Sequence, residues 1–93
     1  MRIGLYTFKI FLPACHSLKD KRRVIKSIKD RMRSRYNVAV SEVDGHDLWQ
    51  SSTIAIVSVS NEDSLLEETF QKIHGEIENM LPGNIIEEKV EFF

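Results

Sequence analysis

Residues 53–60 read TIAIVSVS, a run made mostly of β-branched and small side chains. This composition predicts a strand that is buried over most of its length. Asn61 follows and is predicted to cap a helical segment. The apolar face of that segment is formed by Leu66, Phe70, Ile73, Ile77 and Met80. Pro82 and Gly83 are expected to end it, and residues 85–93 alternate with the period of a strand.

The first half of the chain predicts a strand, a helix and a further strand. Residues 3–12 alternate apolar side chains between two faces, which is the period of a half-buried strand. Ser17 is a good N-cap, with Asp20 in the capping-box position, for a helix over residues 18–36. Residues 38–43 then alternate valines with small or polar side chains and predict a second strand.

The predicted order of elements is therefore strand, helix, strand, strand, helix, strand. Asp44 and Gly45 give the strongest turn signal in the chain, between the second and third strands. Two right-handed β-α-β units of this order interleave into one four-stranded antiparallel sheet with both helices on one face. We predict an α+β, ferredoxin-like fold that comprises residues 1–93 as a single domain, with the first and third strands at the centre.

Composition restricts the class of protein. The chain has 93 residues, of which 42% are hydrophobic and 29% are charged, as in an ordinary globular domain with one core. Cys15 is the only cysteine, so the chain has neither an internal disulfide nor a cysteine metal quartet. Residues 3–12 are too short to span a bilayer and lack the flanks of a signal peptide. We expect a cytoplasmic protein without a membrane partner.

Positive charge is concentrated in one segment. Residues 19–35 contain nine of the thirteen basic residues and two acidic ones, so this segment carries +7 and the rest of the chain −8. The overall net charge of −1 conceals this asymmetry. A concentrated positive face attracts polyanions even when the net charge is slightly negative. Nucleic acid is therefore the leading class of partner.

The basic residues of the predicted first helix form a stripe beside its apolar face. Five of them recur at helical spacing on one flank: Lys19, Arg22, Lys26, Lys29 and Arg33. At 1.5 Å per residue this stripe is about 21 Å long, enough to follow several phosphates. The predicted RNA- or phosphate-binding residues are Lys19, Lys21, Arg22, Arg23, Lys26, Lys29, Arg31 and Arg33. The alternative is a solvated helix face that the acidic second helix complements.

The loop before this helix is a second candidate for phosphate binding. Residues 13–16 lead to the free backbone N–H groups of Ser17, Leu18 and Lys19, where a helix N-terminus favours an anion. Alternatively, Ser17 and Asp20 use these donors themselves as an ordinary capping box.

Trp49 has two interpretations. It is a candidate for stacking on an unpaired base, or it fills the end of the core. The neighbouring Glu42, Asp44, His46 and Asp47 offer oxygen and imidazole ligands, but their spacing is not diagnostic of a metal site. We therefore predict no metal, no cofactor and no catalytic residue.

Three stretches of the chain resemble the YlxP-like family, a small bacterial family whose function is unknown: HSLKDKRR (residues 16–23), RYNVAVSEVD (residues 35–44) and DLWQ (residues 47–50). The resemblance covers essentially the whole chain and implies a ferredoxin-like fold. It implies no activity, because no catalytic residues are assigned in the family. Members are commonly encoded beside translation and ribosome-maturation genes, so the resemblance implies an association with translation.

Assembly and function follow from these features. Leu5, Phe11 and alternate side chains of residues 54–59 are expected on the sheet face that the helices leave open, and this apolar face predicts a homodimer. We interpret the chain as a protein that is not an enzyme and that binds structured RNA, ribosomal RNA in particular, through its first helix. A dimeric small-molecule-binding regulatory domain is the alternative, since one fold hosts many functions.

Overall fold

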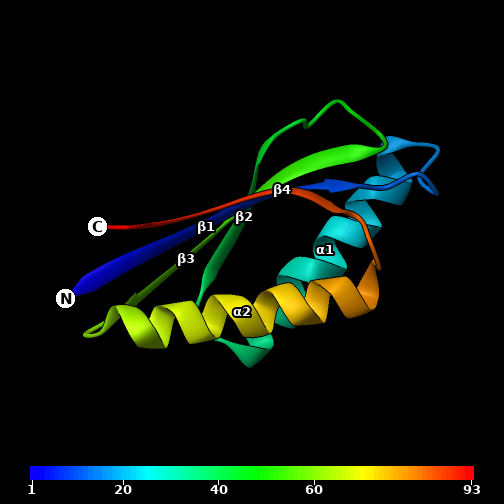
Figure 1. Ribbon diagram of the computed structural model, residues 1–93. Coiled ribbons are helices and arrows are strands. Elements are labelled where there is room, and N and C mark those ends of the chain that lie inside the picture. The colour runs from blue at the N-terminus through cyan, green and yellow to red at the C-terminus, as the bar shows by residue number, and fades with distance from the viewer.

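The computed structural model describes residues 1–93, the whole chain. Its elements in chain order are β1 (Arg2–Phe11), α1 (Leu18–Arg35), β2 (Ala39–Asp44), β3 (Ser51–Ser60), α2 (Asp63–Met80) and β4 (Ile85–Phe92). The strands form one antiparallel sheet in the order β2-β3-β1-β4. Both helices lie against one face of this sheet (Figure 1). The predicted ferredoxin-like fold and its central first and third strands are thus confirmed.

One apolar core fills the space between the sheet and the helices. Tyr6 and Phe8 of β1 lie opposite Ile56 and Ile54 of β3, so the alternating side chains of both central strands turn toward the same face. The helices contribute Ile25, Ile28 and Met32 from α1, and Leu66, Phe70, Ile73 and Ile77 from α2. Met80, predicted for the same face of α2, lies at the margin of the cluster. Burial of these side chains is the main source of stability.

The two helices begin differently. At the start of α1, Ser17 Oγ accepts a hydrogen bond from the backbone N–H of Asp20 at 3.0 Å, as the capping box predicts. The predicted cap of α2 at Asn61 is wrong. The N-cap residue is Glu62, and no side chain caps the helix. Asn61 precedes the cap position, and its side-chain oxygen accepts from the hydroxyl of Ser60 instead, at 3.4 Å.

The connection between β2 and β3 is longer than a tight hairpin. Gly45 has a φ of +77°, which a residue with a side chain rarely adopts, and Asp44 Oδ1 accepts from its N–H at 2.8 Å. The turn signal was therefore placed correctly. The chain then continues through residues 46–50 before β3 begins, and this six-residue connection is called the β2–β3 loop below.

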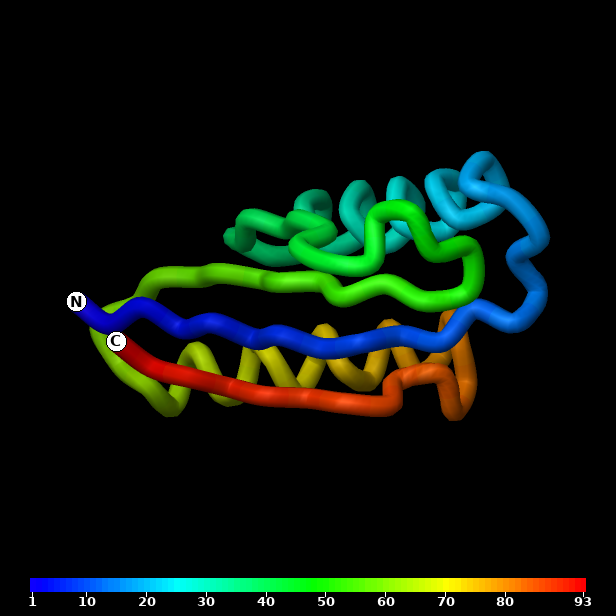
Figure 2. The backbone as a smooth tube through the Cα atoms, turned by 90° about the horizontal axis from the view of Figure 1, so that it is seen from above, coloured from blue at the N-terminus to red at the C-terminus, as the bar shows by residue number.

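The two ends of the chain lie side by side at one end of the sheet (Figure 2). Ile3 and Phe93 exchange two backbone hydrogen bonds, of 3.0 and 2.8 Å. Neither α1 nor α2 combines the length and the apolar character that crossing a membrane requires.

Gly4 allows α2 to approach the sheet closely. A Cβ atom at this position would lie 2.7 and 2.9 Å from two ring carbons of Phe70, and 3.2 Å from a methyl group of Leu66. These distances are shorter than van der Waals contact, so any side chain would displace the helix or its core residues.

We therefore expect Gly4→Ala to lower the free energy of unfolding by about 1–3 kcal/mol, the usual cost of overpacking a core. The matched control is Gly75→Ala in α2, where nothing lies within 4 Å of the added atom. Alanine there should raise the free energy of unfolding by about 0.5–1 kcal/mol, because it is the better helix former. Urea unfolding measures both. Changes of the same sign would contradict the close approach of α2.

Candidate nucleic-acid interface

The nine basic side chains of α1 have different surroundings. Lys21 is buried, Arg31 and Arg35 pair with Glu76 of α2, and Lys26 pairs with Asp30. The remaining five form no ion pair: Lys19, Arg22, Arg23, Lys29 and Arg33. The positive charge of α1 is thus only partly neutralised within the molecule.

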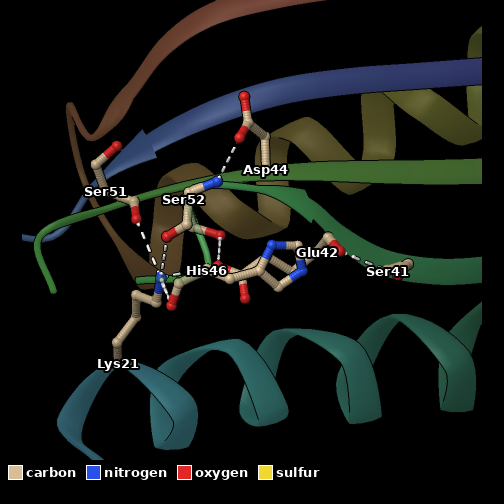
Figure 3. Close-up of polar contacts among 8 residues, drawn as sticks. Lys21, Ser41, Glu42, Asp44, His46, Ser51 and Ser52 are labelled. Atoms are coloured by element: carbon tan, nitrogen blue, oxygen red, sulfur yellow. Dashed lines mark hydrogen bonds and ion pairs between the residues drawn. The ribbon is translucent and has the colours of Figure 1, made fainter. Parts of the chain in front are cut away.

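Lys21 points inward, beneath the β2–β3 loop (Figure 3). Its side chain is 2% exposed. The Nζ atom donates to the carbonyl oxygen of Gly45 at 2.6 Å and lies 3.3 Å from the carbonyl oxygens of both His46 and Ser51. It also lies 2.9 Å from Glu42 Oε2. The prediction that Lys21 binds phosphate is therefore wrong, because its ammonium group cannot reach a ligand in solvent.

Glu42 completes this buried polar cluster. Its Oε2 accepts a hydrogen bond from Ser52 Oγ at 2.5 Å and pairs with Lys21. Burial alone would raise the pKa of Glu42, but the hydrogen bonds from Ser52 and Lys21, together with the charge of Lys21, outweigh burial and lower that pKa. The carboxylate thus remains ionised opposite the ammonium group. Through this pair α1 holds the end of β2 and the β2–β3 loop in place.

A groove of about 510 Å³ runs between α1 and β2 and is called the basic groove below. It is lined by Lys21, Arg22, Ile25, Lys26, Lys29, Asp30, Arg33, Ser41, Glu42 and His46. Five of the predicted binding residues therefore line this groove, the buried Lys21 and four that lie along the α1 wall. His46 of the β2–β3 loop lies in the same groove. The sequence analysis did not assign His46 to the nucleic-acid interface. Arg33 Nη2 donates to the carbonyl oxygen of Val40 at 2.9 Å, which holds the guanidinium group at the edge of β2.

The other flank of α1 faces α2. Glu76 Oε1 lies 3.1 Å from Arg31 Nε and 3.0 Å from Arg35 Nη1, and Tyr36 donates its hydroxyl hydrogen to Glu76 Oε2. The hydrogen bond from Tyr36 contributes most to lowering the pKa of Glu76, and the two arginines lower it further. Glu76 partly neutralises Arg31, whose side chain is still 43% exposed, so its role in phosphate binding stays a prediction. Lys19 and Arg23 are exposed on α1, outside the basic groove.

Trp49 lies at the surface of the β2–β3 loop. Trp49 is 53% exposed, so its interpretation as a side chain that fills the end of the core is wrong. Together with Phe11 and Leu48 it lines a hollow of about 490 Å³. Gln50 Nε2 donates to the carbonyl oxygens of Pro13 and Cys15 at 3.1 and 3.2 Å, which ties this end of the loop to the segment before α1. The indole ring is therefore presented on a fixed backbone.

A capping box forms at the predicted phosphate site in the loop before α1. It occupies the N–H group of Asp20, and Asp20 Oδ2 accepts from the N–H of His16 at 3.1 Å, which places a carboxylate near the start of the helix. Neither hydrogen bond uses the N–H groups of Ser17, Leu18 and Lys19, so phosphate binding there stays a prediction. Cys15 is buried, and burial raises the pKa of its thiol. No three His, Cys, Asp or Glu side chains come close enough together to hold a metal ion, including those of residues 42–47.

Comparison with known proteins identifies relatives of this chain. The family model described as "Protein of unknown function (DUF503)" matches residues 3–90. The uncharacterized protein YlxP of Bacillus subtilis (strain 168) is 35% identical over 71 residues, which cover 76% of this chain and 77% of that protein. The resemblance to the YlxP-like family is therefore confirmed.

Solved structures with the same fold are distant in sequence. A de novo designed protein with a ferredoxin fold, LFR1 1, superposes with a TM-score of 0.54 at 10% identity, over 100% of this chain and 83% of that one. At3g17210 from Arabidopsis thaliana gives 0.54 at 12% identity, over 98% and 92% of the two chains. A dimeric ferredoxin-like protein of unknown function from Thermobifida fusca gives 0.50 at 10% identity, over 98% and 90%. At these identities the likeness shows the fold alone.

The buried ammonium group leads to a prediction about stability. Lys21→Met should lower the free energy of unfolding by about 3–5 kcal/mol, because it leaves the carboxylate of Glu42 buried without its partner. Lys19→Met removes the same charge from an exposed position of the same helix and should change it by no more than about 0.5 kcal/mol. Urea unfolding at neutral pH compares the two variants. Equal losses would mean that Lys21 is not the anchor of the β2–β3 loop.

Proposed function

The chain belongs to the DUF503 family of proteins of unknown function, and we propose that it binds structured RNA along the basic groove and catalyses no reaction. The observation that carries this proposal is the alignment of Arg22, Lys26, Lys29 and Arg33 along one wall of the basic groove. Side chains at this spacing neutralise successive phosphates of a nucleic-acid backbone, and counterion release then supplies most of the affinity.

The solvated-face alternative accounts for only part of this charge. The acidic helix α2 engages Arg31 and Arg35 through Glu76 and leaves the groove side of α1 without a partner. Lys26 pairs with Asp30, but both side chains are more than half exposed, and such a pair contributes little stability and is screened by salt. The basic groove therefore keeps a net positive potential that is available to an external polyanion.

The side chains of the site favour contacts to the phosphate backbone of RNA and to an unpaired base. β3 carries no aromatic side chain, so the sheet lacks the stacking surface that RNA-recognition motifs use. Trp49 supplies one exposed aromatic ring on the loop that also contributes His46 to the basic groove. RNA with an unpaired loop offers both partners, phosphates for the groove and a splayed base for the indole. The gene neighbourhood of the YlxP-like family favours ribosomal RNA as the RNA that is bound.

Two matched double variants test this proposal. Arg22→Gln with Lys29→Gln removes two charges from the basic groove, whereas Arg31→Gln with Arg35→Gln removes two charges from the flank that faces α2. Fluorescence anisotropy with a labelled RNA hairpin measures the dissociation constant between 50 and 200 mM KCl. About four neutralised phosphates give a slope of log K against log salt near −3 to −4, and the groove variant should reduce this slope by about 2.

The control variant should keep the slope of the unmodified protein. Two results would overturn the proposal: a slope near zero for the unmodified protein, or an equal loss of affinity in both double variants. Circular dichroism confirms that each variant remains folded.

We further propose that two copies of the chain pair through the open face of the sheet. Val57 and Val59 lie beside Leu5 and Ile3 on that face, and both valines are exposed. Phe93, whose backbone is hydrogen-bonded to that of Ile3, is exposed at the same end of the sheet. Apolar side chains gathered on one face commonly mark an interface, and a dimer formed there leaves both basic grooves free. The Thermobifida fusca protein with this fold is described as dimeric, which supports the proposal.

Light scattering at micromolar concentration should therefore give the mass of two chains. Val59→Glu places a charge in the proposed interface and should give the mass of one chain. Leu65→Glu introduces the same charge at an exposed position of α2, on the other side of the sheet, and should remain dimeric. A mass of one chain for the unmodified protein would contradict the dimer.

A further inference from the structure

A second groove opens at the opposite edge of the sheet, between α2 and β4, and is called the acidic groove below. It has a volume of about 410 Å³ and is lined by Tyr6, Glu67, Phe70, Gln71, His74, Glu88, Val90 and Phe92. It exists because α2 does not cover the whole inner face of β4. Val90 lies beside the buried Tyr6 on that face, yet it is 43% exposed.

A hydrogen-bonded cluster forms the polar end of the acidic groove. Tyr6 donates its hydroxyl hydrogen to Glu88 Oε1 at 2.5 Å, and His74 Nδ1 lies 2.6 Å from the same oxygen. Burial and the neighbouring carboxylate raise the pKa of Tyr6, so the phenol remains protonated and acts as the donor. The contact between a carboxylate oxygen and His74 Nδ1 requires a hydrogen on that nitrogen.

This arrangement leaves two atoms of the cluster without a protein partner. Glu88 Oε2 and His74 Nε2 take part in no hydrogen bond within the molecule. Glu88 Oε2 is a carboxylate oxygen and therefore an acceptor, so it calls for a ligand that donates hydrogen bonds.

The charge of the lining points to a cation. Glu67 and Glu88 contribute two carboxylates, and no lysine or arginine lines the acidic groove. Phe70, Val90 and Phe92 form an apolar wall beside this polar end, suited to the hydrocarbon part of a ligand.

We propose that the acidic groove binds a small organic cation, a primary amine carried on an aromatic or aliphatic body. The ammonium group donates to Glu88 Oε2, and the body packs on Phe70, Val90 and Phe92. The volume lies in the lower part of the range of roughly 300–1,000 Å³ that is usual for ligand pockets, which restricts the ligand to a small molecule. This site goes beyond the proposed RNA binding and does not depend on it.

Three probes of similar shape and different charge test the site on the unmodified chain: phenethylammonium, phenethyl alcohol and 3-phenylpropionate. Shifts of backbone amide NMR signals during titration report affinity and location together. Phenethylammonium should give saturable shifts confined to α2, β4 and the middle of β1, with at least tenfold weaker binding of the alcohol and none of the carboxylate. Equal affinities for the three probes, or shifts outside these elements, would overturn the proposal.

A matched pair of variants tests whether the charge of Glu88 is responsible for binding phenethylammonium. Glu88→Gln keeps the shape of the side chain and should weaken phenethylammonium binding at least tenfold. Glu87→Gln removes the same charge one residue earlier on β4, on the open face opposite Lys9, and should leave binding unchanged. Equal losses in the two variants would indicate general electrostatic attraction and would refute the site. RNA binding, measured in parallel, should be the same in both variants.

Discussion

The position of a single buried ammonium group determines the geometry of the basic groove. Lys21 Nζ lies among three carbonyl oxygens and one carboxylate, contributed by the β2–β3 loop and the strands on either side of it. Burying a positive charge costs free energy unless hydrogen-bond acceptors surround it. Moving these carbonyl and carboxylate oxygens away from Lys21 Nζ would therefore destabilise the fold. The loop that carries His46 and Trp49 is consequently rigid with respect to α1. Without this cluster, one side of the groove would be a free surface loop.

The order of the elements could be predicted because each one has a simple period. Residues 53–60 form a strand as predicted, but it is not buried over most of its length, because buried Ile54 and Ile56 alternate with side chains such as the exposed Val57 and Val59. Helical spacing from Leu66 to Ile77 corresponds directly to the face of α2 that packs in the core. The burial of Lys21 also had a signal in the sequence. It stands three residues after Leu18 and four before Ile25, on the apolar face of α1, but its charge led to its assignment to the surface. Its partner Glu42 could not be found, because the pairing depends on how α1 crosses β2 in space.

The sequence predicted the candidate site only as a concentration of positive charge on one helix. Composition identified α1 as the basic element, and Arg22, Lys26, Lys29 and Arg33 do lie together in a groove. Which cations remain free depends on packing between the helices, and nothing in the spacing of Arg31 indicates that Glu76 lies beside it. Trp49 was ambiguous for a related reason, since a large aromatic in a loop is equally compatible with a core and with a surface. The acidic groove joins α2 and β4 to β1, which is distant from both in sequence, and so it left no local pattern.

The pairing of the first strand with the last has a consequence for how the chain folds. β1 lies between β3 and β4, and its register joins Arg2 to Ser60 and Gly4 to Phe92. Among the strand pairs only β2 and β3 are neighbours in sequence, so most of the sheet forms by closing long loops, which slows folding. During synthesis the apolar β1 precedes both of its partners, so one edge stays unpaired until β3 is available and the other until β4 is available. Over that interval it is an exposed strand prone to aggregation, the kind of segment that chaperones shield.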